Sequence, residues 1–396
     1  MATSSLRFID LFSGAGGLSE GLGYAGWKGV FACESEPQFA RCYSTNFPSI
    51  MMRNADIQTL DPAKIRKELG MASGELDLVC GGPPYQGFFL ETEDDGFADP
   101  RTQLYRNFLR FVKVFAPRAV LVEAGSNLLT LAKGETFEDM MVGLERLGYG
   151  TDTALLGAHW YGIPQVRWRI FIVGLKGRDV PPNAFPEPEN SCKPMPGFYT
   201  EFRAKDILRR PGPKAAKGHV TVKEAIGDLP KIANGEKWPA GGGYGTKPSC
   251  PYQILARKGS ISVANHDAPS LSAVNLERMS HVPPGGNWLD IPDELLTTAL
   301  LRSRGSDHAE HSDRYGRCSP RGLSGTILSK CDPHWGAFYH YNQERGFTVR
   351  EAARLQSFPD RFVFTGSQLK QFGQVGNAVP PLLAKAVGQS LKKVLK

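Results

Sequence analysis

The sequence predicts an α/β fold, in which a parallel sheet covered by helices is followed by a loop-rich second region. The first 175 residues alternate short apolar runs with amphipathic stretches, which is the rhythm of consecutive β–α–β units. From about residue 178 to residue 325, proline, glycine and isolated charges replace this periodicity. With 396 residues the chain also exceeds the size at which one core usually stops growing, so two domains are expected.

Each strand and helix is predicted from one of these runs. The five candidate strands are residues 7–11, 29–33, 76–80, 119–123 and 169–173. The amphipathic segments that separate them predict helices at residues 17–25, 37–46, 103–115 and 136–147. Helical periodicity returns after Phe347 in the segment TVREAARLQSF, and a last helix is expected at residues 381–395.

Composition limits the classes of protein that the chain can represent. No uninterrupted apolar stretch is long enough to cross a bilayer, and the start MATSSLRFID has no export signal, so a cytoplasmic protein is expected. The seven cysteines stand singly without a CxxC pair, which favours reduced thiols over a disulfide framework or a metal site. The net charge of +7 permits a polyanionic partner without requiring one.

The segment FIDLFSGAGGLSEGL joins an apolar strand to a glycine-rich turn and then to a helix. Such a turn lets a ligand approach the backbone N–H groups at a helix N-terminus. Glu34 and Asp56 lie where a doubly wound sheet binds a nucleoside, at the carboxyl ends of its strands. An ordinary strand–helix turn is the alternative for the glycines, and a helix cap or a solvated charge is the alternative for the two acids.

Six ordered segments resemble the motifs of the DNA cytosine carbon-5 methyltransferases. Within residues 8–387 they are DLFSGAGGLSEGL, GGPPYQGF, LVEAGSNLL, YGIPQVRWRIFIVG, REAARLQSFPD and QVGNAVPP. The resemblance implies a Rossmann-like S-adenosylmethionine-dependent methyltransferase domain at residues 1–177 plus 326–396. It implies a smaller loop-rich target-recognition domain at residues 178–325, and a target base flipped out of double-stranded DNA. A monomer in a prokaryotic cell, with a cognate restriction endonuclease as a candidate partner, fits this family.

The same resemblance assigns the cofactor, S-adenosylmethionine, to the N-terminal motif and to three other places. The methionine part would lie against Phe12, Ser13, Gly14, Ala15, Gly16 and Gly17. Glu34 would bind the ribose hydroxyls, and Asp56 with Ile57 would bind the adenine. The pocket would be completed by Gly82, Asn377 and Val379.

The catalytic cysteine of the family follows the two prolines of its second motif, where this chain has Tyr85. Family enzymes add a cysteine thiolate to carbon 6 of cytosine, while a glutamate hydrogen-bonds ring nitrogen 3. A phenol with an ordinary pKa of about 10 provides little phenolate at neutral pH, so carbon-5 methylation is not expected. Cys80 does not replace the thiol, since it ends an apolar strand and is expected to be a buried core residue.

The rest of the base pocket is kept in part. Glu123 matches the family's glutamate, and its QxRxR pattern, in which an Arg contacts the base carbonyl, is matched by Gln165, Arg167 and Arg169. A strand-end carboxylate and a solvated basic strand are the alternatives. Ala124-Gly125 replaces the family's Asn-Val and Phe89 replaces its serine, and this cluster of departures favours a naturally altered site over an engineered knockout.

Pro83-Pro84-Tyr85 resembles the Pro-Pro-Tyr core of the exocyclic amino methyltransferases, which need no covalent nucleophile. In those enzymes an aromatic ring stacks on the flipped base, and loop oxygens align its amino nitrogen with the methyl donor. Gly82 stands where their polar side chain belongs. Methyl transfer to the amino nitrogen of cytosine or adenine is therefore slightly favoured over a catalytically silent variant that still binds cofactor and DNA.

Duplex DNA is the expected partner of the central region, since residues 203–223 contain seven basic residues and a single acid. The predicted DNA-binding residues are Gln86, Arg203, Lys205, Arg209, Arg210, Lys214 and Lys217. A solvated basic loop is the alternative. The family also has a transfer-RNA branch, but the long central region favours DNA. Which bases are read does not follow from the sequence, because readout depends on a few side chains in irregular loops.

Overall fold

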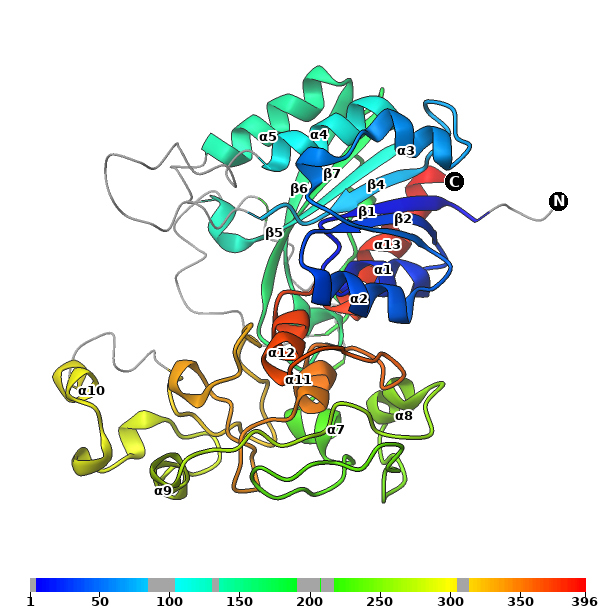
Figure 1. Ribbon diagram of the computed structural model, residues 1–396. Coiled ribbons are helices and arrows are strands. Elements are labelled where there is room, and N and C mark those ends of the chain that lie inside the picture. Colours follow the sequence, from blue (N-terminus) through cyan, green and yellow to red (C-terminus); the bar gives the residue numbers. More distant parts are fainter. Residues whose placement is uncertain (1–4, 85–103, 130–134, 191–206, 208–216, 305–312) are drawn as a thin grey trace. The chain divides into compact units, whose positions relative to one another are not determined.

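The computed structural model describes residues 5–84, 104–129, 135–190, 207, 217–304 and 313–396 (Figure 1). The chain forms two compact units. The first consists of Met1–Tyr161, Trp168–Lys217 and Ala378–Lys396, and the second of Gly162–Arg167 and Gly218–Asn377. The sequence suggested other boundaries: residues 178–217 lie in the first unit and residues 326–377 in the second. The target-recognition role of the central region stays a prediction.

The first unit is built on a seven-stranded sheet in the order β3-β2-β1-β4-β5-β7-β6. Its strands are β1 (Arg7–Leu11), β2 (Lys28–Glu34), β3 (Met51–Asn54), β4 (Leu78–Gly81), β5 (Ala119–Gly125), β6 (Tyr149–Gly157) and β7 (Trp168–Lys176). Strands β1 to β5 are parallel, whereas β7 is antiparallel to both β5 and β6. The prediction of a parallel sheet was therefore wrong at this edge. No helix crosses over between β6 and β7, and without a crossover the second strand returns antiparallel to the first.

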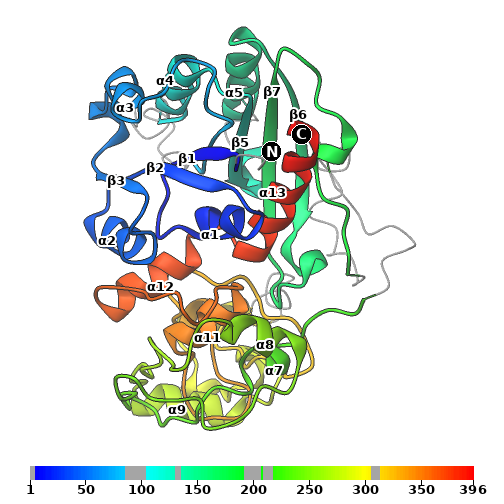
Figure 2. The same ribbon diagram turned by 90° about the vertical axis from the view of Figure 1, so that its right-hand side faces the viewer.

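Helices cover both faces of this sheet. The helices of the first unit are α1 (Gly17–Tyr24), α2 (Pro37–Asn46), α3 (Pro62–Glu68), α4 (Leu104–Phe115), α5 (Glu135–Arg146) and α13 (Pro381–Leu395). Figures 1 and 2 show α3, α4 and α5 on one face and α1, α2 and α13 on the other. Helices α1 and α13 approach closely at Gly21, where an added Cβ would lie 2.3 Å from the carbonyl oxygen of Pro381. The carboxyl ends of β1 and β4 meet where the strand order reverses, which is where doubly wound sheets bind ligands.

The second unit consists of short helices joined by long loops. Its helices are α7 (Val222–Ile226), α8 (Pro251–Arg257), α9 (Ala273–His281), α10 (Thr298–Ser303), α11 (Val349–Leu355) and α12 (Gln368–Gly376). Between its described residues, strand pairing is limited to isolated bridges such as Arg317 with Tyr339. A small apolar core holds α9 and α10 together and consists of Met279, Val282, Trp288, Ile291, Leu296, Leu300, Tyr315 and Tyr339.

Buried ion pairs supply much of the remaining order of the second unit. The side chain of Arg345 donates to both carboxylate oxygens of Glu351, at 2.8 and 2.6 Å. Arg354 donates to both oxygens of Asp360, at 2.5 and 2.6 Å, and to Asp228 at 3.1 Å. All five side chains are buried. These contacts tie α11 to the loops around it, and they give the REAAR segment a structural role.

The helices described in both units include none that is long and apolar enough to span a membrane.

Candidate functional site

The glycine-rich turn after β1 bends sharply because three of its residues have left-handed backbone angles. The φ angles are +58° at Phe12, +55° at Gly14 and +102° at Gly16. Such a conformation strains a non-glycine residue, so Phe12 must be held in place by its surroundings. The backbone N–H of Ser13 donates to the carbonyl of Cys33 at 3.0 Å, which fixes the turn against the carboxyl end of β2.

Glu34, the last residue of β2, joins the ends of two strands. The backbone N–H of Gly14 donates to its Oε2 at 2.9 Å, and the N–H of Glu36 donates to its Oε1 at 2.8 Å. Burial raises the pKa of Glu34 above its ordinary value, although these two N–H groups act in the opposite direction. The result is a carboxylate fixed beside the turn, where it can accept hydrogen bonds from ligand hydroxyl groups.

Glycine at the start of α1 is required by packing as well as by backbone geometry. A Cβ on Gly16 would lie 2.4 Å from the ring of Phe47 and 3.0 Å from that of Tyr43. Ala15 is buried, and Gly17 is the first residue of α1. The predicted turn residues from Phe12 to Gly17 therefore form one tightly packed strand–turn–helix junction.

Asp56 and Ile57 lie side by side after β3, in different environments. Asp56 is exposed and caps the short 3-10 helix Ile57–Thr59, accepting a hydrogen bond from the N–H of Gln58 at 2.9 Å. Ile57 is buried. In this structure Asp56 therefore acts as a helix cap, which was the alternative considered from the sequence. Its contact with adenine stays a prediction.

A polar network beneath the turn was missed in the sequence. The side chain of Ser19 donates to Asp10 Oδ2 at 2.6 Å and lies 2.7 Å from the hydroxyl of Tyr43. Burial raises the pKa of Asp10 to about 7. An aspartate inside the apolar run FIDLF was the available signal, because a buried carboxyl needs partners.

Glu123 and Arg169 form the centre of the candidate base pocket. They come from neighbouring antiparallel strands, in which Gly125 of β5 lies opposite Arg169 of β7. Glu123, two residues from Gly125, faces the same side of the sheet, and its Oε1 lies 2.7 Å from Arg169 Nε. Only 11% of the Glu123 side chain and 19% of the Arg169 side chain are exposed.

The Gly-Pro-Pro loop after β4 faces the same carboxylate. A Cβ on Gly82 would lie 3.0 Å from Glu123 Oε2, so this oxygen occupies the space beside the loop that a side chain at residue 82 would need. Pro83 is buried and Pro84 half-buried. Tyr85 and Gln86 lie outside the described residues.

Gln165 and Arg167 belong to the second unit and are bonded mainly to its backbone. Gln165 donates to the carbonyl of Leu355 at 3.1 Å and accepts from the N–H of Ile327 at 3.1 Å. Arg167 donates to the carbonyls of Ile327 and Gly376 at 3.2 and 2.7 Å. Both side chains are buried, which excludes the solvated basic strand as their explanation. Gln165 and Arg167 thus hold neighbouring backbone segments together. Arg169, in contrast, contacts the carboxylate of Glu123.

The other predicted residues occupy different places. Asn377 is exposed at the C-terminus of α12 in the second unit, and Val379 is buried in the first unit. Lys217 is exposed and lies 3.2 Å from Glu189. The other predicted DNA-binding cations fall outside the described residues, namely Arg203, Lys205, Arg209, Arg210 and Lys214.

The described part of the chain contains no metal centre, and Cys80 does not supply a substitute thiolate. Its His, Cys, Asp and Glu residues form no group of three that could hold a metal ion. Cys80 is buried, its Sγ donates to the carbonyl of Ile9 at 3.3 Å, and burial raises its pKa well above the ordinary value. The expectation that Cys80 is a core thiol is confirmed.

The chain is similar to known proteins of one family. A family model described as C-5 cytosine-specific DNA methylase matches residues 6–393. The type II methyltransferase M.AgeI of Thalassovita gelatinovora is 33% identical, over 98% of this chain and 99% of its own length. The type II methyltransferase M1.HphI of Haemophilus parahaemolyticus is 34% identical, over 98% of this chain and 87% of its own.

A solved structure confirms the predicted α/β methyltransferase fold. It is a prophage-encoded E. coli chain described as a DNA modification methyltransferase, 24% identical, with a TM-score of 0.72 and 99% of both chains covered. At this identity the likeness bears on the fold alone.

Proposed function

The chain belongs to the C-5 cytosine-specific DNA methylase family, and we propose that it methylates the exocyclic amino nitrogen of a flipped DNA base instead of carbon 5. As a member of the family it is a DNA methyltransferase whose cofactor is S-adenosylmethionine. The proposal concerns the atom that receives the methyl group. The observation that carries it is Glu123, whose carboxylate is held by Arg169 beside the loop that leads to Tyr85.

Carbon-5 transfer requires a nucleophile, and the described residues of this pocket do not supply one. Carbon 5 becomes reactive only after a thiolate adds to carbon 6, and the resemblance of GGPPYQGF to the family's motif puts Tyr85 at the position of the cysteine. Among the described cysteines of the sheet, Cys33 and Cys80 are buried, and burial raises the pKa of both thiols. Neither can therefore supply a thiolate at neutral pH.

Transfer to an amino nitrogen requires only alignment and an acceptor for one proton. S-adenosylmethionine, held at the glycine-rich turn and by Glu34, would supply the methyl group from its sulfonium. The amino nitrogen would take this methyl group, and S-adenosylhomocysteine would be released. The nitrogen then loses one proton to Glu123 or to water. A carboxylate that accepts a hydrogen bond from the amino group favours this attack, because it increases electron density on the nitrogen. Tyr85 would stack on the base.

The pairing of Glu123 with Arg169 favours cytosine over adenine. Glu123 would accept a hydrogen bond from the amino group of the base. The Arg169 side chain can only donate hydrogen bonds, and cytosine has a carbonyl oxygen that can accept one on the same edge as its amino group. Adenine has the amino group without a carbonyl. We therefore propose cytosine N4 as the methylated atom.

A catalytically silent variant is the second candidate. Gly82 offers no polar side chain to the amino group, and Ala124 and Gly125 replace the Asn and Val of the family. Such a chain would bind cofactor and duplex DNA without turnover, with Tyr85 filling the place of the thiol. The relatives M.AgeI and M1.HphI are type II methyltransferases, so we place the chain in DNA modification, with a cognate endonuclease and a monomeric state as further predictions.

Mass spectrometry of nucleosides tests the proposal directly. DNA is incubated with the protein and S-adenosylmethionine carrying an isotope-labelled methyl group, then digested and analysed. Label on cytosine N4 supports the proposal, and it should be lost in Tyr85→Ala but largely kept in Tyr85→Phe, which retains the stacking ring. Label on carbon 5 overturns it. Absence of product, with Tyr85→Cys then forming 5-methylcytosine, assigns the chain to the silent class.

A further inference from the structure

Trp335 is unusual among the tryptophans of this chain. All six tryptophans lie among the described residues, and five of them are buried or half-buried. In contrast, 56% of the surface of Trp335 is exposed. An exposed indole ring offers a large, flat surface on which another ring can stack.

The ring of Trp335 is presented by a rigid support. It ends the 3-10 helix Pro333–Trp335, which Asp332 caps by accepting a hydrogen bond from the N–H of His334 at 2.9 Å. The N–H of Tyr315 donates to the carbonyl of Pro333 at 2.6 Å. Tyr315 belongs to the apolar core of the second unit, so the exposed ring is anchored to that core.

Aromatic contacts extend from this core to the exposed ring. The guanidinium of Arg278 lies 5.2 Å from the Tyr315 ring centre, and the Tyr315 hydroxyl lies 2.7 Å from His334 Nδ1. The rings of His334 and Trp335 are perpendicular, with centres 4.8 Å apart. The ring of Trp335 therefore has a fixed orientation, which lowers the entropy that it would lose on binding.

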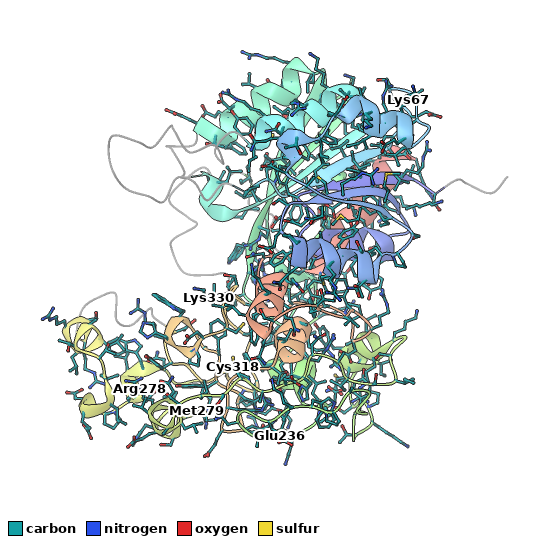
Figure 3. The ribbon with its side chains drawn as sticks, in the orientation of Figure 1. Lys67, Glu236, Arg278, Met279, Cys318 and Lys330 are labelled. Carbon is teal, nitrogen blue, oxygen red and sulfur yellow. The ribbon has the colours of Figure 1, made fainter. Side chains whose placement is uncertain are left out.

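A cation lies beside the Trp335 ring, and the chain segment that leads to it carries a net positive charge. The guanidinium of Arg314 lies 5.4 Å from the centre of the Trp335 ring, and residues 313–335 contain four Arg or Lys residues against two Asp. Of the two acids, Asp332 caps the short helix, and Asp313 is exposed. Figure 3 shows Arg278 and Lys330 on this unit.

We propose that Trp335 stacks on a base of duplex DNA, while Arg314 contacts the adjacent phosphate backbone. A duplex from which one base has been flipped exposes the faces of the neighbouring bases, and an aromatic side chain can cover such a face. Aromatic and cationic groups side by side suit nucleic acid, whose bases stack and whose backbone is anionic. This inference rests on the proposed function in taking DNA as the substrate, and it adds a specific contact residue.

Binding to two duplexes tests the stacking contact without knowledge of the recognition sequence. A short fluorescein-labelled duplex is compared with the same duplex carrying one abasic site, which exposes base faces permanently. Trp335→Ala should bind the abasic duplex about 10-fold more weakly than the wild type, and Trp335→Phe should recover most of that affinity. Ile261→Ala, which removes an apolar side chain that is 95% exposed in the same unit, is the matched control and should bind normally.

Salt dependence separates stacking from phosphate contact. Trp335→Ala should leave unchanged the slope of the logarithm of DNA affinity against the logarithm of salt concentration. Arg314→Ala should reduce the magnitude of this slope by about 1, the value expected for one lost phosphate contact. In the wild type, saturating DNA should protect the exposed tryptophan fluorescence from acrylamide. A melting shift with S-adenosylmethionine shows that each variant is folded.

Two results overturn the inference: Trp335→Ala binding both duplexes as the wild type does, or unchanged acrylamide quenching in saturating DNA. A wild-type protein that binds neither duplex in the presence of cofactor overturns the DNA assignment itself, together with the proposed function. The two failures are thus distinguishable.

Discussion

The two units of this chain are stabilised in different ways. The first contains a seven-stranded sheet whose central strands β1, β4 and β5 are almost entirely buried, and its helices pack on both faces. The second has short helices, loops and isolated bridges around a small apolar core. In the second unit, buried arginine–carboxylate pairs fix segments that no sheet aligns.

The two units are therefore sensitive to different substitutions. A sheet distributes its stability over many hydrogen bonds and apolar contacts, so single polar changes at its surface cost little. A loop-rich unit whose order depends on buried ion pairs loses much when one partner is removed, because the other charge stays buried. Substitutions in the two units measure this contrast.

The largest effect is expected from Asp360→Asn in the second unit. The change removes the bidentate partner of Arg354 and leaves only Asp228 to balance that buried guanidinium. We expect a loss of about 3–5 kcal/mol in the free energy of unfolding, measured by urea denaturation. In the first unit, Arg53→Ala breaks the exposed pair with Glu68 and should cost less than about 1 kcal/mol. Equal losses in the two variants would remove the contrast.

The next effect is a pH dependence that differs between the units. The unfolded chain releases the Asp10 proton near the ordinary pKa of 3.8, whereas the folded chain keeps it to about 7. The folded state therefore binds more protons between these values, and stability falls as the pH rises through this window, by about 2–4 kcal/mol in total. Asp10→Asn, whose amide oxygen can still accept from Ser19, should flatten the profile of urea midpoints.

The carboxylates of the second unit act in the opposite direction. Burial alone would raise the pKa of Asp360 and Glu351, but their arginine partners lower both below the ordinary values. Their contribution is present above those values and is lost as the pH falls below about 4. Hydrogen exchange should therefore show the second unit opening first in acid. An Asp10→Asn variant with an unchanged pH profile, or a first unit that opens before the second in acid, would contradict this assignment.

The sequence predicts the regular parts of the first unit well because their signals are local. Strand β1 and helices α2 and α13 have the predicted bounds, and Pro37 and Pro381 mark where the two helices begin. Strand β6 was missed because its first half, YGTDT, is polar and lacks a clear alternation. The antiparallel orientation of β7 depends on its short connection to β6, so the apolar residues of β7 alone did not predict it.

Some residues of the candidate site could be predicted from local sequence, and others depend on contacts with distant segments. Glu34 was identified because acids near the carboxyl ends of strands gather at one edge of a parallel sheet, whereas Glu123 was identified from the resemblance of LVEAGSNLL to a family motif. Asp10 was missed because its partners Ser19 and Tyr43 come from other elements. The buried contacts of Gln165 likewise depend on segments far along the chain, so the pattern alone could not distinguish a positioning role from contact with a base.

The smallest effect is expected where α1 packs on α13 in the first unit. A Cβ on Gly21 would lie 2.3 Å from the carbonyl oxygen of Pro381 and 2.4 Å from the Cβ of Ala384, so Gly21→Ala must push the two helices apart. We expect a loss of about 1–3 kcal/mol in the free energy of unfolding, measured by urea denaturation. Gly23→Ala, in the same helix with no atom within 4 Å, is the matched control and should gain about 0.5–1 kcal/mol. If both variants gained stability, helix propensity would outweigh the clash, and the sheet unit would tolerate repacking more readily than the 2.3 Å approach indicates.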